Sequence, residues 1–109
     1  MWLLTPSGFL SIVRDTRTDG HVLVRARTRE DIEAIAQRLA PDEPEIVHTP
    51  ERDYAFRISI PRETWAAVAG ELASEIDYPN FKDRVAEVQG NERARLYGEV
   101  WATLREMQR

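Results

Sequence analysis

The chain has 109 residues, of which 42% are hydrophobic and 31% are charged, and its net charge at pH 7 is -4. This composition excludes a disordered or membrane-embedded chain, and the length fits a single α+β domain over residues 1–109. The absence of cysteine excludes disulfides and sulfur-ligated zinc, and we expect no metal and no other cofactor. Pro6 and Gly8 interrupt the apolar start, so no secretory signal or membrane span is predicted and we expect a cytoplasmic protein.

The first two predicted elements are strands that form a hairpin. Residues 9–14 and 21–27 are rich in β-branched and apolar side chains. Between them lies Asp19-Gly20, a strong turn signal, so the two runs are expected to pair.

A helix is predicted to follow the hairpin. Thr28 can cap the free backbone amides of a helix, and Asp31 follows three residues later, as in a capping box. Apolar residues then recur at helical spacing through residues 32–39. Pro41 and Pro44 are expected to end the helix.

Two more strands are predicted in the middle of the chain. Residues 45–49 indicate a weak strand, whereas residues 54–60 alternate clearly between apolar and polar or small side chains. The alternation predicts that Tyr54 and Phe56 face the helices and that Arg57 lies on the opposite face.

The C-terminal part predicts three helices. Pro61 suits the first turn of one helix, and Tyr78-Pro79 breaks it. Asn80 caps a short helix that Gly90 ends, and Asn91 is expected to cap the last helix. The apolar stripes that define the first and last of these helices are Trp65, Val68, Ala69, Leu72 and Ile76, and Leu96, Val100, Leu104 and Met107, with Trp101 beside the last stripe.

The order of elements is therefore β-β-α-β-β-α-α-α. The part from the second strand to the second helix is a ferredoxin-like unit without its last strand, and the first strand can take the missing place. We expect a four-stranded antiparallel sheet with helices on one face, a permuted ferredoxin-like arrangement in which the second and fourth strands are central neighbours.

Several short segments carry a resemblance over nearly the whole chain. They are Met1-Trp2 with Thr5, Gly8-Phe9 and Ser11; Val24-Arg25-Ala26-Arg27; Asp53-Tyr54-Ala55-Phe56-Arg57; and Glu75-Ile76-Asp77-Tyr78 with Asn80-Phe81-Lys82. With these the chain resembles a family of small bacterial proteins that has no assigned activity. The resemblance implies one compact bacterial domain and implies nothing about mechanism.

The candidate binding residues are three arginines on the predicted open face of the sheet. Arg25, Arg27 and Arg57 would converge there, with Arg14 as a fourth candidate, and gathered guanidinium groups bind phosphate or carboxylate well. Three interpretations stay open. The face binds an anion or RNA, or it is a solvated face whose arginines pair with acidic residues, or it is buried in a homodimer. The acidic residues considered for such pairing are Asp15 and Glu45.

Nucleic acid is disfavoured among these ligands, although it is not excluded. The net charge is negative, whereas nonspecific binding to nucleic acid needs a positive field. Readers of single-stranded RNA also stack bases on aromatic residues of an open sheet face, and Tyr54 and Phe56 are predicted to face the other way.

Catalysis is not expected, and no catalytic residue is assigned. His21 and His48 are isolated and lack metal-ligand spacing, and no glycine-rich phosphate loop or nucleophile motif is present. An enzyme with a cleft near His48 and Asp77 is the second alternative. The leading hypothesis is a non-catalytic binding module that forms a homodimer, because the C-terminal helices offer more apolar surface than a small sheet can cover.

Overall fold

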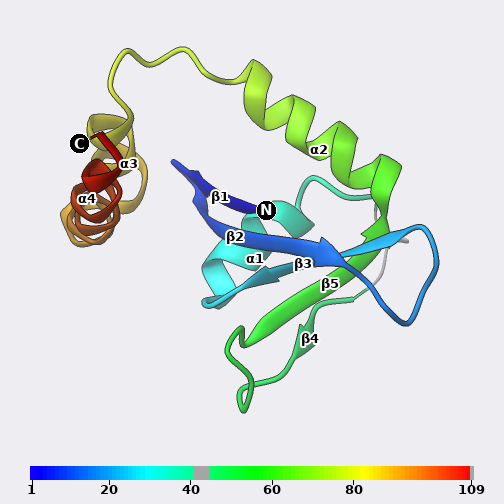
Figure 1. Cartoon of the computed structure of the whole chain (residues 1–109). Helices are drawn as coiled ribbons and strands as arrows, with labels where there is room; N and C mark the ends of the chain where they lie inside the picture. Colours follow the sequence, from blue (N-terminus) through cyan, green and yellow to red (C-terminus); the bar gives the residue numbers. More distant parts are fainter. Residues whose placement is uncertain (41–44, 109) are drawn as a thin grey trace. The chain divides into compact units, whose positions relative to one another are not determined.

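The computed structural model describes residues 1–40 and 45–108 (Figure 1). Pro41 and Pro44, where the first helix was expected to end, lie outside the described residues. The elements in chain order are β1 (Trp2–Thr5), β2 (Gly8–Arg14), β3 (His21–Ala26), α1 (Arg29–Ala36), β4 (Val47–His48), β5 (Phe56–Pro61), α2 (Arg62–Ser74), α3 (Phe81–Gln89), α4 (Asn91–Leu104) and the 3₁₀ helix η1 (Arg105–Gln108).

The chain divides into two compact units. Unit 1 comprises Met1–Leu4 and Gly8–Ile76, and unit 2 comprises Thr5–Ser7 and Asp77–Arg109. Unit 1 holds the sheet with helices α1 and α2, and unit 2 holds helices α3 and α4. The expectation of one domain over the whole chain stays a prediction.

The α+β class is confirmed, but the sheet has five strands rather than the four expected. Its strand order is β1-β2-β3-β5-β4, and the pairs β2–β3, β3–β5 and β4–β5 are antiparallel. The additional strand is β1, which includes Trp2 and lies at the edge of the sheet beside β2. The sequence did not predict β1 because four residues before a proline are too short for a periodic pattern to be recognised.

The predicted pairing of the second and fourth strands is confirmed as the pairing of β3 with β5. Arg25 of β3 lies directly opposite Arg57 of β5, and Val24 lies opposite Ile58. Successive side chains of a strand point to opposite faces, so this register places both arginines on one face and both aliphatic residues on the other.

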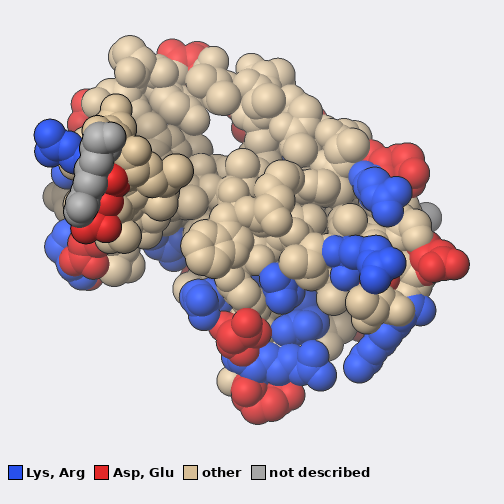
Figure 2. Space-filling model, in the orientation of Figure 1, with Lys and Arg blue, Asp and Glu red and all other residues tan. Residues whose placement is uncertain are grey.

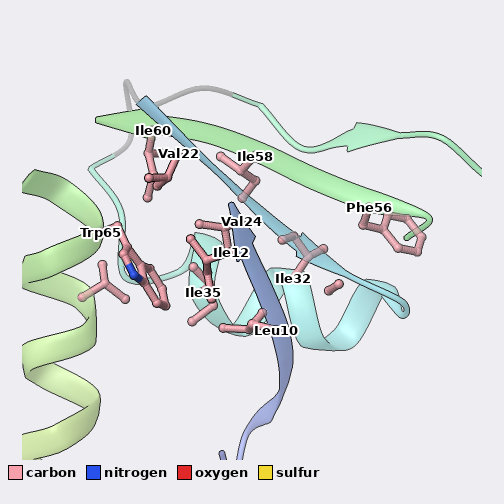
Figure 3. Close-up of a cluster of buried hydrophobic side chains, with 12 residues drawn as sticks. Leu10, Ile12, Val22, Val24, Ile32, Ile35, Phe56, Ile58, Ile60 and Trp65 are labelled. Carbon is pink, nitrogen blue, oxygen red and sulfur yellow. The ribbon is translucent and has the colours of Figure 1, made fainter. Parts of the chain in front are cut away.

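Helices α1 and α2 cover the aliphatic face of the sheet. Ile32 and Ile35 of α1 and Trp65 of α2 are buried there against alternate residues of the strands (Figure 3). Helix burial of this kind, at roughly 1.5–3 kcal/mol for each large apolar side chain, stabilises unit 1. The strand residues of this core are Leu10, Ile12, Val22, Val24, Ala26, Phe56, Ile58 and Ile60.

The start of α1 is fixed by two contacts of Asp31. Its backbone N–H donates to the Thr28 hydroxyl at 3.2 Å, which confirms the expected cap. Its carboxylate accepts a hydrogen bond from the backbone N–H of Phe9 at 2.9 Å. Asp31 is only 3% exposed, so this buried carboxylate joins the helix to β2.

In unit 2, helices α3 and α4 form a pair joined at Gly90. Gly90 is the N-cap of α4, so the expectation that Asn91 caps this helix was wrong, and the φ of 95° at Gly90 is a conformation that glycine adopts without strain. Asn80 caps α3 by accepting a hydrogen bond from the Asp83 backbone N–H at 2.9 Å, as expected. Phe81 of α3 stacks on Tyr97 of α4 with ring centres 5.8 Å apart, and this contact holds the two helices together.

Candidate functional site

The three arginines predicted to form a binding site lie on the open face of the sheet, opposite α1 and α2. Arg25 and Arg57 are paired across β3 and β5, and Arg27 follows β3 directly. Arginine side chains gather over β2, β3 and β5 in the space-filling view, with some acidic side chains beside them (Figure 2). We call Arg25, Arg27 and Arg57, together with Tyr54, the arginine face.

Tyr54 lies on the arginine face, so the expectation that it faces the helices was wrong. The guanidinium carbons of Arg25 and Arg27 lie 4.6 Å and 4.5 Å from the centre of its ring, and Tyr54 is only 4% exposed. Tyr54 precedes β5 and sits in a bend, where the alternation of strand side chains does not apply. Phe56, which lies within β5, is buried in the helix-facing core as expected.

Neutral oxygen atoms hold the three guanidinium groups in place. Nη2 of Arg25 donates to the Ser11 hydroxyl at 2.7 Å. Nη1 of Arg27 donates to the Asp53 backbone carbonyl at 2.6 Å, and Nη2 of Arg57 donates to the Tyr54 carbonyl at 3.2 Å. A guanidinium group has five N–H donors, so each of these arginines keeps donors for a ligand.

No carboxylate forms an ion pair with these three guanidinium groups in the part of the chain that the structure describes. Asp15, which was considered as a partner, instead accepts hydrogen bonds from the Ser59 hydroxyl at 2.6 Å and from the Arg17 backbone N–H at 2.9 Å. The solvated-face interpretation depended on such pairs, and this geometry does not supply them.

The surroundings of Arg57 disfavour the positive charge of its guanidinium group. Its Nε atom is buried and has no hydrogen-bond partner among the described residues. Burial lowers the pKa of Arg57 below its ordinary value. The positive charges of Arg52 and Arg25 lower this pKa further, and the carboxylate of Asp53 acts against them. An anion beside Arg57 would stabilise the charged form of its guanidinium group.

Two further aromatic residues extend the arginine face toward the edge of the sheet. Phe9 of β2 lies 6.4 Å from Tyr54 between ring centres, and Trp2 of β1 meets Phe9 edge to face at 5.9 Å. Trp2 is 70% exposed. The sequence analysis did not place Trp2 or Phe9 at the site. The alternation of Phe9 and Ser11 with the core residue Leu10 could have shown that Phe9 lies on the face of the sheet opposite the helices.

Arg14, the fourth candidate, does not join the arginine face. It lies opposite Val22 in the β2–β3 register, and Val22 belongs to the helix-facing core. Arg14 therefore lies on the other side of the sheet from Arg25, and it is exposed.

The residues of the enzyme alternative lie in different units. His48 of unit 1 stacks on Phe56, with ring centres 4.6 Å apart and planes inclined by 5°. Asp77 of unit 2 forms an ion pair with Arg84 at 3.1 Å. His21 lies within 3.1 Å of the Asp19 carbonyl oxygen through Nδ1. Each group thus has a structural contact of its own, and an acid–base pair of His48 with Asp77 stays a prediction.

Within residues 1–40 and 45–108, no three acidic or histidine side chains cluster in a way that could hold a metal ion. None of the helices described is long and apolar enough to cross a bilayer. Comparisons with protein-family models, with curated proteins and with solved structures found no match. The functional argument therefore depends on the residues of this chain.

Proposed function

We propose that this chain is a non-catalytic binding module whose arginine face holds an anionic ligand. The observation that carries the proposal is the set of three guanidinium groups held by neutral oxygens with no paired carboxylate in the described structure. Guanidinium groups bind phosphate and carboxylate through charge-assisted hydrogen bonds, which are about twice as strong as neutral ones.

The packing of Tyr54 supports this proposal because it orients two of the three groups in advance. A guanidinium stacked on an aromatic ring loses less freedom when a ligand binds. The contacts of Arg25 and Arg27 with Tyr54 are in place without any ligand. Preorganisation of this kind raises affinity by lowering the entropic cost of binding.

Burial of the arginine face in a symmetric homodimer is the weaker interpretation. A twofold interface brings the same patch of both subunits together. The arginines of one copy would then meet those of the other without acidic partners, and like charges at a desolvated contact cost several kcal/mol. We therefore favour a ligand on this face rather than a second copy.

The strand order supports the ferredoxin-like classification, which we also propose. Strands β2-β3-β5-β4 run in the order expected when the first strand replaces the missing last strand of the unit, and β1 adds a further edge. In a ferredoxin-like sheet the helices cover one face only, so the other face is open to a ligand, and the arginine face lies on this open side.

Thermal unfolding of the full chain with increasing inorganic pyrophosphate tests the proposal. A ligand that binds the folded state raises the unfolding midpoint with concentration. We expect this shift for the natural chain and for Arg14→Met, and its loss when Arg25, Arg27 and Arg57 are all replaced by methionine, which keeps an apolar stem. Equal shifts in the triple variant, or none in the natural chain, would overturn the proposal.

Self-association through α4 is a second candidate function, favoured by a separate observation in unit 2. Leu96, Val100 and Leu104 of α4 form one stripe and are 44%, 38% and 55% exposed, and Trp101 beside them is 64% exposed. Trp101, whose position beside the predicted apolar stripe favoured a core role, is exposed and contacts Arg105. Clustered exposed apolar residues mark interaction surfaces.

The charges beside the α4 stripe are paired within the helix. Arg95 forms ion pairs with both Glu92 and Glu99, so its guanidinium group offsets one of the two carboxylate charges and one negative charge is left. Light scattering behind size-exclusion chromatography tests self-association. We expect a dimer that Leu104→Glu dissociates, whereas Val47→Glu, at a residue that is 52% exposed in unit 1, leaves it intact. A monomer at micromolar concentration would refute this candidate.

A further inference from the structure

The aromatic residues beside the arginine face bear on the kind of anion that it binds. A small inorganic anion would need the guanidinium groups alone. The structure also presents Trp2, 70% exposed, in a line of rings with Phe9 and the buried Tyr54. Exposed indole rings are costly to leave in water, and their flat faces suit stacking of another ring.

We propose that the anionic ligand is a single-stranded nucleic acid that places phosphates on Arg25, Arg27 and Arg57 and stacks a base on Trp2. This inference rests on the proposed anion-binding function. Proteins that bind single strands combine a positive track for the backbone with aromatic side chains on which bases stack. Both parts are present on one helix-free face of this sheet.

The structure changes one argument that the sequence raised against nucleic acid. Phe56 faces the helices as expected, and Tyr54 is buried among the arginines, but Phe9 and Trp2 continue the aromatic line across β2 and β1, and Trp2 offers an exposed ring. The other argument is the net charge of -4. A local field is what a bound strand experiences within a Debye length of about 8 Å in physiological salt, and over β2, β3 and β5 basic side chains gather (Figure 2).

An acidic peptide is the main competing ligand. It would satisfy the arginines equally well, but its carboxylates offer no ring to stack on Trp2. A double-stranded nucleic acid is disfavoured for the same reason, because its bases are already stacked on one another.

Fluorescence anisotropy with a labelled oligouridylate of about eight nucleotides, within the range of single-strand site sizes, tests this inference. The measurement uses the full chain and is repeated with oligothymidylate, which separates RNA from DNA as the source of the ligand. Contacts to three phosphates predict that log K falls with log salt concentration with a slope of about -2. Binding is also expected to quench tryptophan emission.

The decisive variant is Trp2→Ala, with Ile76→Ala as its control. Loss of one base stack is expected to weaken oligonucleotide binding roughly 5- to 150-fold and to abolish the quenching. Ile76 is an apolar residue of unit 1 that is 60% exposed and follows α2, so its truncation should leave the affinity unchanged. Trp2→Phe, which retains an aromatic face, should recover part of the affinity.

The outcomes separate this inference from the proposed function. If pyrophosphate shifts the unfolding midpoint but oligonucleotides bind Trp2→Ala and the natural chain equally, the arginine face binds anions and the stacking inference is wrong. The inference also fails if a duplex of equal length, or polyglutamate, binds as tightly as the single strand. If neither pyrophosphate nor any oligonucleotide binds, both proposals fail together.

Discussion

Arg25 and Arg57 lie directly opposite each other on paired antiparallel strands, on the face of the sheet that carries no helix. Directly opposite residues of such strands are separated by about 4.5–5.5 Å at their Cα atoms. Like charges at this position are destabilising in a sheet. The repulsion between Arg25 and Arg57 therefore lowers the stability of the free protein, and a bound anion would offset this repulsion.

Replacing Arg57 by methionine should separate stability from binding. The substitution removes a partly buried charge whose pKa is lowered by burial and by neighbouring arginines, while the apolar stem is kept. We expect an unfolding midpoint in urea that equals or exceeds that of the natural chain at low salt, together with weaker binding of pyrophosphate. A lower midpoint would show that Arg57 stabilises the free fold, contrary to our interpretation.

Removal of the Tyr54 ring should affect both the fold and the arginine face. Tyr54 is 4% exposed, and truncation of a buried aromatic side chain to alanine costs about 3 kcal/mol or more in unfolding free energy. Tyr54→Phe keeps the ring on which Arg25 and Arg27 lie, so it should retain ligand affinity and most of the stability. Urea unfolding and a pyrophosphate titration of both variants provide the check, and equal effects would argue against the role of the ring.

The stability of unit 1 should depend on the ionisation of Asp15. Hydrogen bonds from the Ser59 hydroxyl and then from the Arg17 backbone lower the pKa of Asp15 below its ordinary value. Its contribution is therefore present above about pH 4, the ordinary range of a carboxyl group, and is lost as the pH falls through the lowered value.

Ser59→Ala removes the largest cause of this lowered pKa. The variant should unfold at lower urea than the natural chain at pH 7, and the gap should narrow below about pH 4. Ser74→Ala is the matched control, because the Ser74 hydroxyl donates to the backbone carbonyl of Glu71 and to no carboxylate. A gap for Ser59→Ala that is constant with pH would contradict the assignment.

Two glycine substitutions should have opposite signs. A Cβ atom at Gly8 would lie 2.8 Å from Cγ of Asp31, the carboxylate that joins α1 to β2, so Gly8→Ala should destabilise by about 1–3 kcal/mol. Gly70 lies inside α2 with no described atom within 4 Å of such a Cβ, so Gly70→Ala should stabilise by about 1 kcal/mol. Chemical denaturation measures both, and a stabilised Gly8→Ala would refute the close approach to Asp31.

The sequence was sufficient to predict the side of the sheet on which Arg25 and Arg57 lie. Both residues fall within regular strands, where alternation is strict, and the ferredoxin-like order of elements predicted that their two strands are neighbours. Thr28 and Asn80 were predictable as caps for a similar reason, because the hydrogen bonds involved are local.

Tyr54 and Trp2 were beyond the same argument. Tyr54 stands before the first residue of β5, and its direction depends on contacts with Arg25 and Arg27, which are distant in sequence. Trp2 belongs to a four-residue strand whose partner could not be identified from periodicity. The positions of Tyr54 and Trp2 therefore depended on tertiary contacts that no short pattern encodes, whereas Phe9 lies within β2 and follows its alternation.

The arginine face forms during folding only when β5 takes its place between β3 and β4. Strands β2 and β3 are joined by a short turn and can pair early, whereas β5 reaches β3 only after α1 and β4 have been enclosed in a long loop. Arg25 and Ser11 meet in the early hairpin, but Arg57 joins them only with the last and slowest pairing. We therefore expect a nascent or partly unfolded chain to lack the assembled cluster of positive charge, and the proposed anion binding to require that the non-local sheet has formed.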